Sequence, residues 1–148
     1  MPLKILLVED NAGDAELVLQ AFASAGSQAD IVRVDRLQAA MAALRAGQFD
    51  VVVLDLMLPD SGDPYRTLAE ARRLTNGTPI VVHSGCNDVV LSAHCRDDGA
   101  RGFCLKAVPS PLPTMLASMF FTADEDERDA DAALERLHEL CYSNAATE

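Results

Sequence analysis

Five short apolar runs alternate with stretches of helical periodicity along most of this chain. The runs are rich in Val, Ile and Leu, as is typical of central strands in a parallel sheet that is covered on both faces. Strands are therefore expected at 3–8, 31–34, 51–56, 80–84 and 103–105. Alternation of strand and helix predicts an α/β fold with right-handed crossovers and helices on both faces of the sheet.

The stretches between these runs carry apolar residues at i, i+3, i+4 and i+7, a spacing that places them on one face of a helix. In the first stretch, 12–25, this face consists of Ala15, Val18, Leu19 and Phe22. Further helices are expected over 37–47, over 64–75, over about 87–98, and around Met115, Leu116, Met119 and Phe120. A chain of 148 residues with this pattern is expected to form one domain with a sizeable core.

Acidic residues directly follow two of the expected strands. Glu9 and Asp10 follow the first strand, and Asp55 follows Val51-Val52-Val53-Leu54. The carboxyl ends of neighbouring parallel strands meet at one edge, where such sheets bind ligands. Carboxylates about 4 Å apart repel by roughly 4 kcal/mol at an effective dielectric near 20, so the cluster needs a proton or a cation. Mg²⁺, with oxygen ligands and retained waters, fits best.

The net charge of −11 is concentrated in the C-terminal segment. Residues 1–121 hold 14 acidic and 10 basic residues, whereas 122–148 hold nine acidic and two basic ones. An apolar stripe in this segment predicts a sixth helix over about 126–142. This helix could pack on its own domain, form a dimer contact, or lead toward an output domain. A chain this acidic is not expected to bind nucleic acid through a basic surface.

The remaining composition points to a cytoplasmic protein. The longest apolar run is far too short to span a membrane. The N-terminus enters a strand directly, without a basic region or a cleavage-type pattern, so no signal peptide is expected. The four cysteines form no CxxC pair and no zinc spacing, which indicates reduced thiols in a cytosolic protein. No membrane partner is expected.

Four motifs, in this order, resemble the receiver domain of two-component response regulators. They are Val8-Glu9-Asp10-Asn11, Asp55-Leu56-Met57-Leu58-Pro59-Asp60-Ser61, Ser84-Gly85, and Gly99-Ala100-Arg101-Gly102-Phe103-Cys104-Leu105-Lys106. The resemblance implies a CheY-like, flavodoxin-like, doubly wound sheet of order 2-1-3-4-5. It also implies a receiver domain over 1–121. The acidic extension over 122–148, with the extra C-terminal helix that its apolar stripe predicts, follows this domain.

The resemblance implies a phosphoacceptor site for a two-component phosphorelay. Asp55 would accept a phosphoryl group from a sensor histidine kinase or a phosphotransfer protein and become an aspartyl phosphate. Mg²⁺ would be the cofactor, bound by Glu9, Asp10, Asp55 and the backbone carbonyl of Met57. The domain would phosphorylate and dephosphorylate itself, and would not be a turnover enzyme.

The other two motifs imply the means of switching. Lys106 would pair with the phosphoryl group, and Ser84 would donate a hydrogen bond to it. Phe103 would change rotamer when Ser84 moves. Such a change would alter contacts with a downstream protein or a second copy of the chain, which makes a homodimer an alternative partner.

Three features depart from the family pattern. Ala107 follows Lys106, where most receivers have a proline after a cis peptide bond. A non-proline cis bond costs ~2.5–4 kcal/mol, so a trans or rearranged loop is expected. The usual Asp-Gly pair appears in reverse as Gly62-Asp63. Met57 and Cys86 stand at positions that tune hydrolysis, and neither orients an attacking water well, which predicts a long-lived phosphoryl group.

Several other functions compete with this interpretation. The chain could be the N-terminal receiver module of a longer multidomain regulator or sensor kinase. An aspartyl-phosphate hydrolase is disfavoured, because Met57 stands where such an enzyme wants a second aspartate as general acid. A flavin-binding module is disfavoured because Glu9 and Asp10 would repel its phosphate. A phosphorylation-independent scaffold would not need the acidic set together with Lys106.

Overall fold

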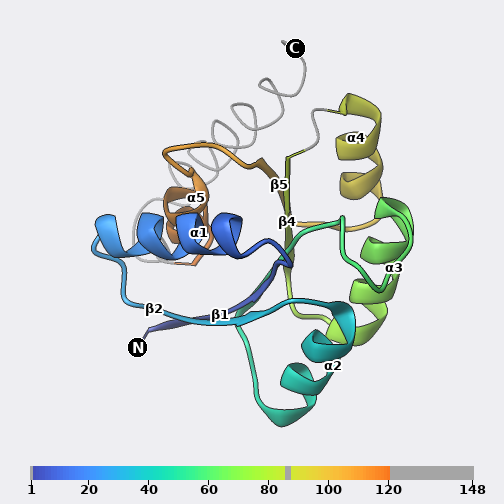
Figure 1. Cartoon of the computed structure of the whole chain (residues 1–148), viewed down its shortest axis with the longest axis horizontal. Helices are drawn as coiled ribbons and strands as arrows, with labels where there is room; N and C mark the ends of the chain where they lie inside the picture. The colour runs from blue at the N-terminus through green and yellow to red at the C-terminus, as the bar shows by residue number, and fades with distance from the viewer. Residues whose placement is uncertain (1, 86–87, 121–148) are drawn as a thin grey trace.

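The computed structural model describes residues 2–85 and 88–120. Strands and helices alternate along this part of the chain (Figure 1). The strands are β1 (Leu3–Val8), β2 (Ala29–Val34), β3 (Val51–Leu54), β4 (Ile80–Ser84) and β5 (Gly102–Leu105). The helices are α1 (Ala12–Ser24), α2 (Leu37–Ala46), α3 (Pro64–Thr75), α4 (Val89–Asp97) and α5 (Leu112–Phe120). All strand pairs are parallel, in the order β2-β1-β3-β4-β5, which confirms the predicted fold.

Helices cover both faces of the sheet, α1 and α5 on one side and α2, α3 and α4 on the other (Figure 1). Side chains of β1 alternate between the two resulting cores. Leu6 and Val8 belong to the core under α2–α4, and Ile5 and Leu7 to the core under α1 and α5. Because both faces are buried, the central strands β1, β3 and β4 are mostly apolar, with Lys4, His83 and Ser84 as exceptions, and this is the pattern that predicts them from the sequence.

Some expectations from the sequence differ from the structure. Leu19 is 36% exposed, although it was expected on the buried face of α1 with Val18 and Phe22. The stripe that faces the sheet is narrower than the predicted one, because Leu19 lies about 100° round the helix from Val18. The third strand ends at Leu54 instead of residue 56. The expected helix over 126–142 and the extension over 122–148 lie outside the described residues.

Side-chain caps hold the helix N-termini at the carboxyl edge of the sheet. Asn11 caps α1, and its side-chain oxygen accepts the N–H of Asp14. Asp63 caps α3 by accepting the N–H of Arg66. Gly62 precedes it with φ +88°, a left-handed conformation that favours glycine. The reversed Gly62-Asp63 pair therefore supplies a turn and then a cap. No helix in the described part of the chain has the length and apolar character needed to cross a bilayer.

Candidate functional site

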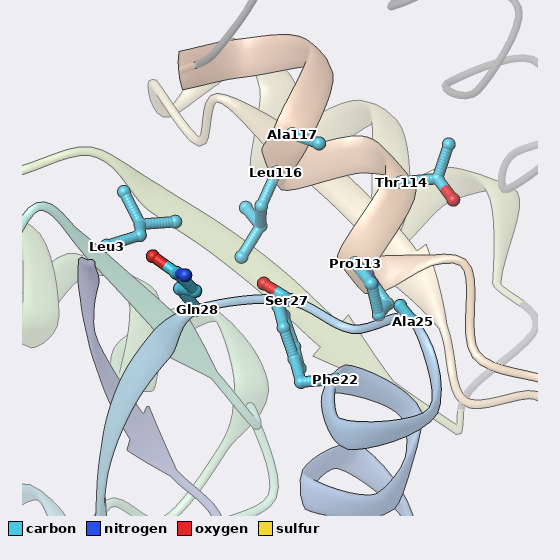
Figure 2. A pocket seen from close by; sticks show the side chains of 9 residues that line it. All are labelled: Leu3, Phe22, Ala25, Ser27, Gln28, Pro113, Thr114, Leu116 and Ala117. Atoms are coloured by element: carbon cyan, nitrogen blue, oxygen red, sulfur yellow. The ribbon is translucent and has the colours of Figure 1, made fainter. Parts of the chain in front are cut away.

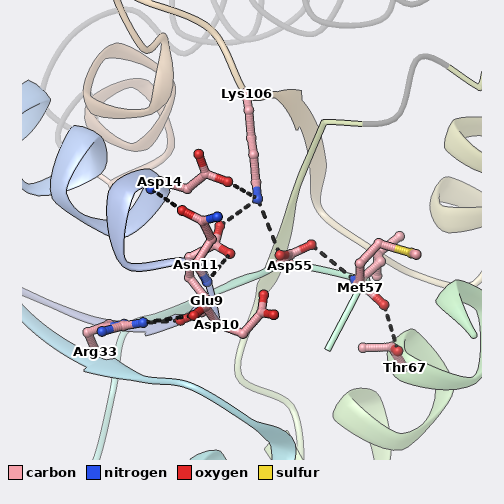
Figure 3. A network of polar contacts seen from close by, with 10 residues as sticks. Glu9, Asp10, Asn11, Asp14, Arg33, Asp55, Met57, Thr67 and Lys106 are labelled. Carbon is pink, nitrogen blue, oxygen red and sulfur yellow. Dashed lines mark hydrogen bonds and ion pairs between the residues drawn. The ribbon is translucent and has the colours of Figure 1, made fainter. Parts of the chain in front are cut away.

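The three predicted acids meet at the carboxyl edge of β1 and β3. These strands are neighbours with Val8 opposite Leu54, and the N–H of Asp55 donates to the carbonyl of Val8 at 2.9 Å. One carboxylate oxygen each from Glu9, Asp10 and Asp55 lies within 4.8 Å of the others. Figure 3 shows their side chains converging at this edge. The parallel pairing of the two strands thus produces the expected acidic cluster.

Burial differs among the three carboxylates. Glu9 and Asp55 are buried, whereas Asp10 is exposed. The pKa of Glu9 is raised to about 7, mainly by burial and also by the neighbouring Asp55, and Lys106 only partly offsets the rise. At neutral pH the Glu9 carboxyl group is therefore only partly ionised. An all-oxygen donor set, an excess of negative charge and one solvent-facing acid fit a small divalent cation such as Mg²⁺.

Lys106 binds the cluster from the end of β5. Its backbone N–H donates to the carbonyl of Ser84 at 2.8 Å. Its ammonium Nζ lies 2.7 Å from Glu9 Oε1, 2.8 Å from Asp14 Oδ2 and 3.2 Å from Asp55 Oδ2 (Figure 3). Burial lowers the pKa of Lys106, but hydrogen bonds to Asp14 and Glu9 and the charge of Asp55 raise it above the ordinary value. Lys106 is therefore charged at neutral pH.

Two residues that the sequence analysis did not single out also touch the site. Asp14 belongs to the first turn of α1 and pairs with Lys106. Arg33 of β2 donates from Nε to the carbonyl of Glu9 at 3.0 Å and from Nη2 to the carbonyl of Asp10 at 3.2 Å. The position of Asp14 in the first turn of the helix that follows Glu9 and Asp10 was a usable signal. No sequence signal marked Arg33.

The loop after β3 is held at both ends. The N–H of Met57 donates to Asp55 Oδ1 at 3.0 Å, and the buried hydroxyl of Thr67 donates to the carbonyl of Leu56 at 2.8 Å. The carboxylate of Asp60 accepts the backbone N–H groups of residues 37 and 38, the first turn of α2, each at 3.0 Å. The loop is thereby fixed to two helices. The Met57 side chain is exposed. The role of the Met57 backbone carbonyl as a metal ligand stays a prediction.

The two predicted switch residues are both buried. Ser84 lies at the end of β4 and Phe103 in β5, with exposures of 1% and 0%. Phe103 packs in the core under α2–α4. Their roles in switching stay predictions. Among the described residues the cis peptide bond precedes Pro109, so the Lys106–Ala107 bond is trans.

Of the cavities that flank α1, one adjoins the acidic cluster. This cavity, of about 220 Å³, is lined by Asp14, His83, Lys106 and Ser110, with apolar residues around them. Burial lowers the pKa of His83 to about 4, so its ring is neutral, and within the described residues neither ring nitrogen has a hydrogen-bond partner. A larger cavity, of about 460 Å³, lies between α1 and α5 at the opposite end of the sheet (Figure 2). Its lining holds no charged side chain, so it offers no chemistry related to the acidic cluster.

Comparisons with known proteins agree with this geometry. Residues 5–116 match the family described as the response regulator receiver domain. The swarming motility regulation protein RssB of Serratia marcescens is 31% identical over 115 residues, which are 78% of this chain and 50% of RssB. The transcriptional regulatory protein TcrA of Mycobacterium tuberculosis is 33% identical over 103 residues, 70% of this chain and 40% of TcrA. This chain thus spans half or less of the length of these relatives.

A solved structure gives the same fold. The phosphorylated cyanobacterial phytochrome response regulator RcpA superposes with a TM-score of 0.63 and 25% identity. The superposition covers 97% of this chain and 96% of RcpA. The similarity therefore extends over nearly all of the RcpA chain.

Proposed function

This chain belongs to the response regulator receiver family, and on that premise we propose that it is the phosphoacceptor of a two-component phosphorelay. Asp55 receives the phosphoryl group from a phosphohistidine on a sensor kinase or phosphotransfer protein. One observation carries the proposal: Asp55 lies beside the buried acid Glu9 and within 3.2 Å of the Lys106 ammonium. The phosphorylated state of RcpA supports it by analogy.

The transfer needs a nucleophile and a place for the leaving group. A carboxylate oxygen of Asp55 attacks phosphorus, and the P–O bond of an acyl phosphate forms as the P–N bond of phosphohistidine breaks. The electron pair of the broken bond stays on the imidazole nitrogen, which then takes a proton from solvent. No redox change occurs. The hydrogen bond from the Met57 N–H fixes the orientation of the Asp55 carboxylate for this attack.

Charge is the main obstacle to this reaction. The phosphoryl group brings negative charge to an edge that already carries Glu9, Asp10 and Asp55. Mg²⁺, bound by these acids and the Met57 carbonyl, would neutralise the transferring oxygens when present. Lys106 supplies the fixed positive charge of the chain itself. Most of the catalysis is then positioning and electrostatic stabilisation.

The outcome of phosphorylation is a change in protein contacts. In this proposal Ser84 donates a hydrogen bond to the phosphoryl group, and Phe103 rearranges with it. A surface of loops and helices would differ between the unphosphorylated and phosphorylated states. In the phosphorylated state this surface would bind a downstream protein or a second copy of the chain. The protein acts in the cytoplasm as a signalling domain and not as a turnover enzyme, because Met57 offers no general acid. The greater length of its curated relatives also suits a receiver module within a larger regulator.

Intact-mass measurement with acetyl phosphate and Mg²⁺ tests the proposal. Wild type is expected to gain the mass of one phosphoryl group, and Asp55→Asn is expected to gain none. Asp30→Asn is the matched control, because Asp30 is exposed at the start of β2, at the opposite end of the sheet. Phosphoryl uptake by Asp55→Asn, or none by wild type, would contradict the proposal.

A further inference from the structure

We propose that Asp14 is a positioning residue that restrains Lys106 before phosphorylation and is the partner that Lys106 releases when the phosphoryl group arrives. The inference rests on the proposed function, because it concerns the lysine that meets the phosphoryl group. It adds a fourth carboxylate, from α1, to the site formed by the strand ends.

The geometry places Lys106 among three competing acids. Its ammonium has three N–H donors and contacts three carboxylates. The contact with Asp14, at 2.8 Å, is shorter than the contact with Asp55, at 3.2 Å. Two of the donors make hydrogen bonds, to Asp14 and Asp55, and the ammonium is also ion-paired with Glu9. A phosphoryl oxygen on Asp55 that draws the ammonium toward itself therefore competes with these contacts.

Burial decides which contact is given up. The side chains of Glu9 and Asp55 are 1% and 6% exposed, whereas the side chain of Asp14 is 35% exposed. Taking the cation from a buried carboxylate leaves an uncompensated buried charge. Asp14 can replace the ammonium with water at much smaller cost. Asp14 is therefore the exchangeable partner.

The position of Asp14 on α1 favours the same exchange. Asp14 lies in the first turn, where the helix dipole stabilises a negative charge. Its backbone N–H is fixed by the side-chain oxygen of Asn11 at 2.9 Å. After Lys106 leaves, water can solvate the partly exposed Asp14 carboxylate, and the capped backbone of Asp14 stays in place. Asp14 thus lowers the affinity of the site for a phosphoryl group, although the site can form without Asp14.

Beryllofluoride titration at saturating Mg²⁺, followed by NMR, tests this role. Asp14→Asn weakens the contact and Asp14→Ala removes it. Both variants are expected to bind beryllofluoride tighter than wild type, by about two- to fivefold, the range of a partly exposed ion pair. Glu16→Gln is the matched control, because Glu16 is an exposed acid of the same helix whose carboxylate has no contact with Lys106. It is expected to bind as wild type does.

A second readout separates restraint of Lys106 from a structural role. Loosening of α1 would weaken the binding of both Mg²⁺ alone and beryllofluoride, whereas the proposal requires that only beryllofluoride binding tightens. Equal or weaker beryllofluoride binding by the Asp14 variants would overturn the inference and leave the proposed function intact. Equal tightening by Glu16→Gln would also overturn it, as an effect of net charge. Failure of wild type to bind beryllofluoride would instead remove the proposed function, and the inference with it.

Discussion

Lys106 and Glu9 form the shortest ion pair of the site, with 2.7 Å between Nζ and Oε1 and with the Glu9 side chain 1% exposed. The pair joins the end of β5 to the end of β1 across β3 and β4. Because Glu9 is buried, this lysine is a counter-ion of the folded protein as well as a candidate partner of the phosphoryl group. Stability and function are therefore coupled at this residue.

Lys106→Met is expected to lower the free energy of unfolding of the metal-free protein by about 2–4 kcal/mol, because it leaves buried acids without their cation. Saturating Mg²⁺ is expected to restore most of the loss, since the ion supplies the missing charge. Urea unfolding with and without Mg²⁺ measures both effects. Lys4→Met is the control, because Lys4 is exposed and outside the acidic cluster. A loss of equal size under both conditions would argue against a shared counter-ion role.

Glu9→Gln is expected to change how stability depends on pH. The pKa of Glu9 is raised from 4.5 to about 7 in the folded protein, mainly by burial. Its contribution to stability is therefore complete below about pH 4.5 and is lost as the pH rises through 7, by up to about 3 kcal/mol. In metal-free urea unfolding, wild type should lose stability relative to Glu9→Gln across this window. Added Mg²⁺ should remove the loss by replacing the proton, and parallel pH profiles would contradict the assignment.

His83→Leu is expected to stabilise the protein by about 1–3 kcal/mol, because it removes a buried ring whose nitrogens have no hydrogen-bond partner within the described residues. The pKa of His83 is lowered from 6.5 to about 4, mainly by burial. Its effect thus opposes that of Glu9: wild type loses stability as the pH falls from about 6.5 to 4. Thermal melts at both ends of this range measure the change. A destabilised variant would show that the ring is satisfied by groups such as ordered water in the adjoining cavity.

Asp60→Ala is expected to destabilise the protein by about 1 kcal/mol, because Asp60 accepts two backbone N–H groups from the first turn of α2. Hydrogen exchange should quicken at residues 37 and 38 and in the loop after β3. Asp63→Ala removes the cap of α3 instead and should leave exchange at α2 unchanged. Equal hydrogen-exchange rates at α2 in both variants would contradict the capping of α2 by Asp60.

The sequence was sufficient to predict the fold and the acidic cluster, since both follow from strand order. Each central strand consists mostly of apolar residues, and parallel pairing brings the residue after one strand beside the residue after the next. Glu9, Asp10 and Asp55 were placed together on that basis alone. The buried face of α1 was also predictable, except for the marginal position Leu19.

The contacts of long charged side chains were not predictable. Asp14, Arg33 and Asp60 each act on a partner more than 20 residues away in the sequence. Their reach depends on rotamers and helix placement, which apolar periodicity does not specify. Gly62-Asp63 was identified as a departure from the family pattern, but only its backbone conformation shows that the reversal creates a cap.

The clamp of Arg33 on the carbonyls of Glu9 and Asp10 has a mechanical consequence. Arg33 belongs to β2, which is an edge strand of the sheet and pairs only with β1. Edge strands are the places where a sheet starts to fray. Detachment of β2 would break both hydrogen bonds at once and free the backbone of Glu9 and Asp10 to move. The affinity of the site for a divalent ion would then depend on whether β2 is paired with β1.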